Sequence, residues 1–149
     1  MDTTWDGLPV GSGNPVAVAI VIWRRSARGR EYLILHRHQG GPQWEGDWAW
    51  TPPAGARQPG EDRDAAAARE LREETGLVLA AEPLEHETDD VALFVAEAPP
   101  GAKIALDSEH DRFEWVTLDD ALARCLPAIV GRGLVLADEW VARRPDARG

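Results

Sequence analysis

The chain has 149 residues, with 26 Asp and Glu against 16 Lys and Arg, which gives a formal net charge of −10. This length suits one domain, so we expect a single domain over residues 1–149, with a loose polar lead-in over residues 1–13. Surfaces that bind nucleic acid are normally basic, and the negative charge therefore disfavours a nucleic-acid partner.

The sequence shows no sign of export or membrane insertion. Its longest wholly apolar run, Val16 to Trp23, is too short to span a bilayer, and the first residues lack the basic and apolar regions of a secretion signal. Cys125 is the one cysteine, so no internal disulfide can form. We therefore expect a cytoplasmic location and no membrane partner.

The first third of the chain has the pattern of short strands. β-Branched and alternating residues predict strands over 16–23 and 31–37, joined by a turn over 24–30 as a hairpin. A loop over 39–47 leads to a short strand over 48–51. Pro52 and Pro53 then end any regular ladder, because proline has no N–H to donate.

The rest of the chain mixes helices and strands without a regular alternation. After a loop over 54–60, high helix propensity predicts a helix over 61–75 with Gly76 as its C-cap. Further strands are expected over 78–85, 91–96 and 113–116, and helices from Leu118 and over 129–143. This order predicts the α+β class, as an α/β/α sandwich with a central mixed β-sheet, rather than a doubly wound parallel fold.

Three glutamates are expected on one side of the 61–75 helix. Glu70, Glu73 and Glu74 stand at i, i+3 and i+4, while Ala67, Leu71 and Thr75 form an adjoining stripe that can pack against the sheet. A hard divalent cation such as Mg²⁺ converts the repulsion among such carboxylates into coordination. From the helix alone, the commoner interpretation is a solvated surface whose arginines neutralise the glutamates.

The spacing upstream favours the metal site. The full pattern is Gly55-x5-Glu61-x7-Arg69-Glu70-Leu71-x-Glu73-Glu74-x-Gly76-Leu77, which resembles the complete signature of the Nudix hydrolases. At average residue frequencies, matches at its seven fixed polar or glycine positions arise by chance at roughly one start position in 10⁸ to 10⁹. The chain is therefore identified as similar to the Nudix hydrolases.

The resemblance implies a Nudix-type α/β/α sandwich and hydrolysis of a nucleoside diphosphate linked to another moiety. It implies metal ligation by Glu70, Glu73 and Glu74, with the carbonyl of Ala54 as an additional ligand, and Mg²⁺ or Mn²⁺ as the cofactor. Arg69 is expected to orient the carboxylates and to pair with Glu61, while Gly55 and Gly76 serve the backbone geometry. A metal-bound water attacks phosphorus while a carboxylate takes its proton, with Glu70 as the first candidate in the helix.

Flanking segments narrow the resemblance. Residues 50–55, 59–62 and 108–110 are similar to motifs of the asymmetric diadenosine-tetraphosphate hydrolases, and the last also to some nucleoside triphosphate pyrophosphatases. In that comparison Glu109 matches a loop glutamate that binds metal or acts as the base. Ala54 replaces a phosphate-binding lysine, and Leu93 and Phe94 stand where the branch has a stacking tyrosine. A dinucleoside polyphosphate and a nucleoside triphosphate therefore both stay open as substrates.

Other residues near the signature are candidates for substrate contacts. Arg37 and Arg57 are candidates for phosphate binding, and Trp48 for stacking on a base. A second functional hypothesis is a Nudix-fold nucleotide sensor without turnover, although a pure binder has no need of every acid in the signature. The expected partner is a small-molecule nucleotide, and a homodimer would be unsurprising by base rate.

Overall fold

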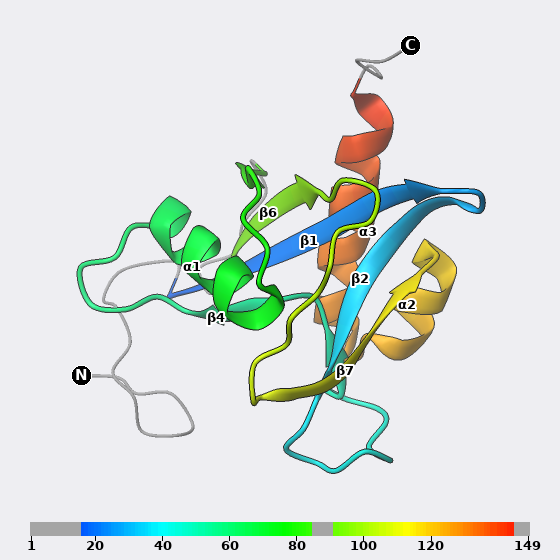
Figure 1. The fold of residues 1–149 in the computed structure, drawn as a ribbon, viewed down its shortest axis with the longest axis horizontal. Helices are drawn as coiled ribbons and strands as arrows, with labels where there is room; N and C mark the ends of the chain where they lie inside the picture. The colour runs from blue at the N-terminus through cyan, green and yellow to red at the C-terminus, as the bar shows by residue number, and fades with distance from the viewer. Residues whose placement is uncertain (1–15, 85–90, 145–149) are drawn as a thin grey trace.

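In the computed structural model of the protein, a mixed sheet carries helices on both faces (Figure 1). The structure describes residues 16–84 and 91–144. The strands are β1 (Ala17–Ser26), β2 (Gly29–Arg37), β3 (Trp50–Thr51), β4 (Ala54–Ala56), β5 (Glu82–Pro83), β6 (Val91–Glu97) and β7 (His110–Val116). The helices are α1 (Arg63–Thr75), α2 (Leu118–Arg124) and α3 (Ala128–Arg143). The expected lead-in over residues 1–13 lies outside the described residues.

The sheet follows the order β3-β2-β1-β6-β5, with β4 paired to β1 and β7 paired to β2. Strands β1 and β6 run parallel, with Ile20 beside Phe94, whereas the other pairs are antiparallel. This confirms the predicted α+β class with a central mixed sheet.

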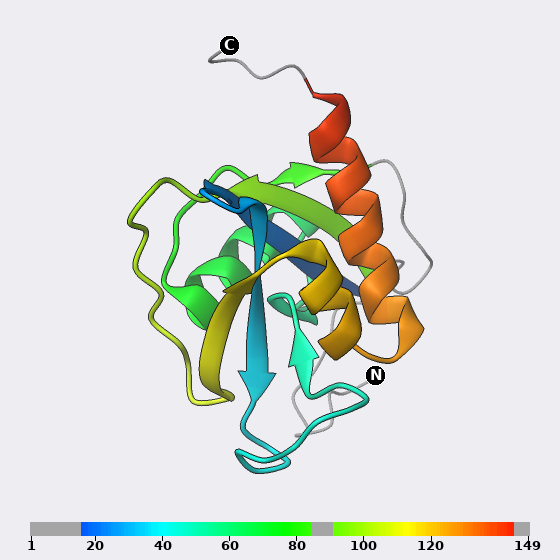
Figure 2. The same ribbon diagram turned by 90° about the vertical axis from the view of Figure 1, so that its right-hand side faces the viewer.

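Alternation along β1 builds two cores, because successive side chains of a strand point to opposite faces. Ile20 and Ile22 pack on the face covered by α1, where they meet Leu71. Val21 and Trp23 pack on the other face, in one cluster with Leu134 of α3. Figure 2 shows α2 and α3 on the side of the sheet away from α1, which is the predicted α/β/α arrangement.

Several predicted boundaries were wrong. The turn expected over 24–30 is confined to residues 27 and 28, because cross-strand pairs continue to Ser26 and Gly29. The loop expected over 54–60 begins with β4, which hydrogen-bonds to β1 across the Ala19 and Ala54 pair. Pro52 and Pro53 therefore interrupt the ladder without ending it.

Other boundaries shifted for local reasons. In the strand expected over 78–85, only Glu82–Pro83 pairs with β6, residues 77–81 do not join the ladder, and Glu85 lies outside the described residues. The strand expected over 48–51 is reduced to Trp50–Thr51. The helix expected from residue 61 begins at Arg63, because Asp62 takes the N-cap position. No described helix has the length and apolar content needed to cross a membrane.

Candidate metal and phosphate site

Both ends of α1 are held by caps that set its direction. The carboxylate of Asp62 accepts a hydrogen bond from the N–H of Ala65 at 2.7 Å, which satisfies one of the free amides of the first turn. Gly76 ends the helix at φ +76°, a left-handed conformation that glycine adopts without strain, and its N–H donates to the carbonyl of Arg72. The two caps therefore fix the residues at which the helix begins and ends.

Burial separates the three glutamates of α1. Ala67, Leu71 and Thr75 are buried as predicted, and they press the helix onto the sheet. Glu70 and Glu74 follow them inward and are 7% and 3% exposed, whereas half of the Glu73 side chain faces solvent. The carboxylates of Glu70 and Glu74 are therefore buried, whereas that of Glu73 lies at the protein surface.

Strand β4 passes directly over the two buried glutamates. The N–H of Ala54 donates to the Oε1 atom of Glu74 at 3.2 Å. A β-carbon on Gly55 would overlap the carboxyl group of Glu70, so any other residue at this position would displace that carboxyl group. The backbone of β4 therefore lies against the two buried glutamates of the helix, and metal ligation by the Ala54 carbonyl stays a prediction.

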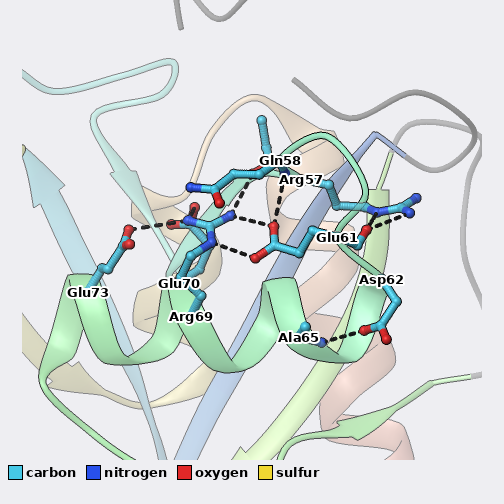
Figure 3. Close-up of polar contacts among 9 residues, drawn as sticks. Arg57, Gln58, Glu61, Asp62, Ala65, Arg69, Glu70 and Glu73 are labelled. Atoms are coloured by element: carbon cyan, nitrogen blue, oxygen red, sulfur yellow. Dashed lines mark hydrogen bonds and ion pairs between the residues drawn. The ribbon is translucent and has the colours of Figure 1, made fainter. Parts of the chain in front are cut away.

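The guanidinium of Arg69 ties this cluster together (Figure 3). Its Nε and Nη2 atoms donate to both carboxylate oxygens of Glu61 at 2.7 and 2.9 Å, and Nη1 donates to Glu70 at 2.7 Å and to Glu73 at 3.2 Å. Nη2 also donates to the carbonyl of Ala56 in β4. The hydrogen bonds from Arg69 lower the pKa of Glu61, and those to Glu61 raise the pKa of Arg69.

Arg57 lies beside this network. Its Nε and Nη2 atoms donate to the backbone carbonyl of Glu61 at 3.0 and 2.8 Å. In the structure this predicted phosphate ligand braces the loop before α1, and its contact with substrate stays a prediction.

A loop before β7 completes the acidic cluster. Single carboxylate oxygens of Glu74, Asp107 and Glu109 all lie within 4.8 Å of one another. Asp107 and His110 are functional candidates that the sequence analysis missed. The Nδ1 atom of His110 lies 2.8 Å from Asp107, and its Nε2 atom lies 4.0 Å from Glu74. The signal for Asp107 was its place two residues before Glu109, on the same loop.

Oxygen ligands at this spacing fit a hard divalent cation. Burial, a hydrogen bond to Glu70 and repulsion from Glu70 together raise the pKa of Glu74 well above its ordinary value. Such a carboxyl group is unfavourable in its charged form, and a cation between the acids removes that cost. The acidic cluster can therefore hold a divalent metal ion, with Glu74, Asp107 and Glu109 as the converging donors. Metal ligation by Glu70 and Glu73, which lie outside this set of three, stays a prediction.

The raised pKa of Glu74 predicts how the metal-free protein responds to pH. Because folding makes Glu74 bind its proton more tightly, the folded state carries an extra proton between the unfolded value of 4.5 and the raised folded value. The free energy of unfolding therefore falls as pH rises through this interval. We expect Glu74→Gln to remove this loss and to unfold at higher urea than the wild type at neutral pH in the presence of a chelator.

The measurement is urea unfolding with a chelator across about pH 5 to about pH 9. Asp64→Asn, an exposed acid on the same helix, is the control and should follow the wild type. Parallel pH profiles for the wild type and Glu74→Gln would contradict the prediction.

Two other predicted substrate residues meet at a cavity of about 180 Å³. Arg37, Trp48 and Ala54 all line it. The backbone N–H of Ala54 also donates a hydrogen bond to Glu74, so the cavity lies next to the acidic cluster. Trp48 is 46% exposed and has φ +69°, the one positive φ among described residues other than glycine. Arg57 does not line this cavity.

The family of the chain follows from its match to a known domain. The sequence model of the NUDIX domain matches residues 13–134, and the chain therefore belongs to the NUDIX domain family.

The chain is also similar to individual proteins and solved structures. The chain is 28% identical over 118 residues to the asymmetrical bis(5'-nucleosyl)-tetraphosphatase of Caenorhabditis elegans, covering 71% of this chain and 81% of that protein. A crystal structure of a C. elegans Ap4A hydrolase binary complex matches with a TM-score of 0.68 and 30% identity, covering 85% of this chain and 96% of that one. An octanoyltransferase of Myxococcus xanthus is 33% identical over 121 residues, covering 73% of this chain but only 32% of that protein.

Proposed function

We propose that the protein is a Mg²⁺-dependent pyrophosphohydrolase that cleaves a phosphoanhydride bond of a nucleoside diphosphate-linked substrate, with Mn²⁺ able to replace Mg²⁺. A dinucleoside polyphosphate or a (deoxy)nucleoside triphosphate is the expected substrate. The enzyme class, a hydrolase acting on pyrophosphate bonds, is supported by the NUDIX domain and by the C. elegans tetraphosphatase. The observation that carries the proposal is the convergence of Glu74, Asp107 and Glu109.

Each part of the site has a role in this proposal. When bound, the divalent ion neutralises phosphate oxygens and supplies an activated water. Glu70, Glu73, Glu74, Glu109 and the Ala54 carbonyl are the proposed donors, and Asp107 joins them on its geometry. Arg69 holds Glu70 and Glu73 in place through its two hydrogen bonds.

A carboxylate must accept the proton of the attacking water. Glu109 is more exposed than Glu70, which already accepts a hydrogen bond from Arg69. Glu109 also lies with Glu74 and Asp107 in the acidic cluster, and we propose it as the base ahead of Glu70.

The alternative is a nucleotide sensor that binds without turnover. A purely binding site gains nothing from buried, mutually repelling acids such as Glu70 and Glu74, so the geometry favours the enzyme. The cytoplasmic location, the exclusion of nucleic acid and a homodimeric assembly stay predictions.

The test is product analysis by phosphorus NMR with a panel of dinucleoside polyphosphates and nucleoside triphosphates. Wild type and Glu74→Gln are compared with Mg²⁺, with Mn²⁺ and with a chelator. We expect metal-dependent turnover by the wild type alone, and the products identify the bond that breaks. Nucleotide binding without turnover in either protein would favour the sensor.

A further inference from the structure

His36 of β2 is a completely buried histidine whose two ring nitrogens both meet oxygen atoms. Its Nδ1 atom lies 2.7 Å from the Oδ1 atom of Asp111 in β7, and its Nε2 atom lies 2.7 Å from the carbonyl oxygen of Trp44. The ring also packs edge-on against the indole of Trp50, with ring centroids 4.9 Å apart. His36 therefore joins β2 and β7 to the loop over residues 38–49.

Two oxygen acceptors require two N–H donors. A neutral imidazole carries one N–H and satisfies one of these oxygens, whereas the doubly protonated ring satisfies both. The Nη1 atom of Arg112 lies 3.3 Å from Nδ1, but it also donates to the carbonyl of Pro42 at 3.1 Å and to Asp111. The contact of Nδ1 with Asp111 is the shorter one, which favours an N–H on Nδ1 that donates to the carboxylate.

The charges around the ring favour the same form. Four charged side chains surround His36 and the indole of Trp50 beside it, namely Glu45, Asp111, Arg112 and Arg124. Arg124 is balanced by Glu114, at 2.8 Å. Among the described residues, Arg112 is the one arginine or lysine that pairs with Glu45 or Asp111, at 3.7 and 3.3 Å. One guanidinium balances one carboxylate, so a doubly protonated His36 supplies the positive charge for the other.

Trp44 anchors the loop over residues 38–49. Its indole packs beside the core, and a β-carbon on Gly40 would overlap it, so the loop folds closely around this ring. The Trp44 carbonyl is the one that faces His36. Trp48 follows in the same loop and lines the cavity next to the acidic cluster. A change in the position of Trp44 is therefore expected to move Trp48.

We propose that doubly protonated His36 is a positioning residue, which holds the loop over residues 38–49 in the arrangement that binds nucleotide, so that nucleotide binding weakens when the second proton is lost. The inference rests on the proposed function, because it takes a nucleotide as the ligand.

The direction of the pH dependence follows from the two acceptors. Histidine is the side chain that ordinarily loses its proton between about pH 5 and about pH 8. The N–H that remains stays with Asp111, because hydrogen bonds to charged acceptors are the stronger ones. The Trp44 carbonyl then faces a ring nitrogen without a hydrogen, and a buried carbonyl without a donor is unfavourable. The loop is therefore held best at low pH and is released as pH rises.

The test follows His36, the loop and nucleotide binding in the full chain from about pH 5.5 to about pH 8.5. Nitrogen-15 NMR counts the N–H groups on the His36 ring, and the amide signals of Trp44 and Trp48 report the loop. Titration with an ATP analogue that has methylene bridges between its phosphates, in the presence of Mg²⁺, gives the dissociation constant. We expect the ring and both amides to change with one midpoint, and binding to weaken by roughly 2- to 10-fold, the contribution of one hydrogen bond. A single N–H on His36 at every pH overturns the proposal.

Two neutral variants separate the contact with Trp44 from general packing. The amide of His36→Gln reaches the place of Nε2 and can donate to Trp44, so we expect tight binding by this variant at every pH. The amide of His36→Asn reaches only the place of Nδ1, so this variant should bind as weakly at low pH as the wild type does at high pH. Equal affinities of the two variants at low pH would contradict the positioning role.

His38→Gln is the matched control, because His38 is an exposed histidine in the same loop. It should keep the wild-type pH profile. Each His36 variant is expressed as a ratio to this control at the same pH, so that the titration of other groups cancels. A wild-type pH profile in His36→Gln would overturn the proposal.

Binding of the analogue is independent of turnover, so the two proposals can fail separately. Binding that depends on His36 in a protein that hydrolyses no nucleotide would refute the hydrolase function and leave the positioning role intact. Nucleotide turnover together with binding that is unchanged in His36→Asn would refute the positioning role alone.

Discussion

Glu74→Gln is expected to lower kcat by about 10³-fold, because a divalent ion contributes several kcal/mol of charge stabilisation and each 1.4 kcal/mol is a factor of ten. Glu74 lies at the centre of the acidic cluster, next to Asp107 and Glu109 and under the N–H of Ala54. Glutamine keeps the shape of the side chain but removes its charge and one oxygen donor.

The structure also predicts an order among the glutamates. Glu73→Gln should cost less activity than Glu74→Gln, because half of the Glu73 side chain faces solvent. Steady-state kinetics with a varied Mg²⁺ concentration, together with Mn²⁺ binding measured by water proton relaxation, separates lost metal affinity from lost turnover. Asp64→Asn is the control on the same helix. Equal turnover by Glu74→Gln and the wild type would remove Glu74 from the site.

Local patterns predicted the elements that carry the signature. The helix, its Gly76 cap and its buried stripe depend on residues within a few turns of one another, where periodicity and capping chemistry act directly. The hairpin of β1 and β2 likewise follows from adjacent segments, although its turn proved shorter than expected.

Contacts between distant segments could not be predicted from local patterns. The pairing of β4 with β1 places Gly55 against Glu70, and nothing near residue 55 specifies that partner. Asp107 enters the acidic cluster only because β7 pairs with β2 and brings its loop to α1. The unequal burial of Glu73 and Glu74 also depends on how far the helix is rolled against the sheet, which spacing alone leaves open.

Local patterns also could not identify which residues line the cavity. Trp48 was a candidate among several tryptophans in one loop, and its left-handed backbone becomes visible only in the structure. Thr51 lies within the motif over residues 50–55, but it was not a candidate for a substrate contact, because a threonine in a short strand is ordinary. Its burial, at 5% exposed, and its place on the cavity wall are seen only in the structure.

Arg69→Ala is expected to lower the free energy of unfolding by about 3–5 kcal/mol, since removing one partner of a buried ion pair leaves the others charged and uncompensated. Arg69 is 14% exposed at its side chain, and Glu61 and Glu70 are 13% and 10% exposed. Glu70 would lose its positive partner while still facing Glu74. Urea unfolding in the presence of a chelator measures the loss without a contribution from metal binding.

Arg69→Lys separates charge from geometry. Lysine keeps the positive charge but cannot make the forked pair with both oxygens of Glu61, so its loss should fall between those of the wild type and Arg69→Ala. Arg72→Ala, an exposed arginine on the same helix, is the matched control and should change the unfolding free energy by about 0.5 kcal/mol or less. If Arg69→Ala were as stable as this control, the Arg69 cluster would have to be regarded as a solvated surface network, and the positions of Glu61 and Glu70 would need another cause.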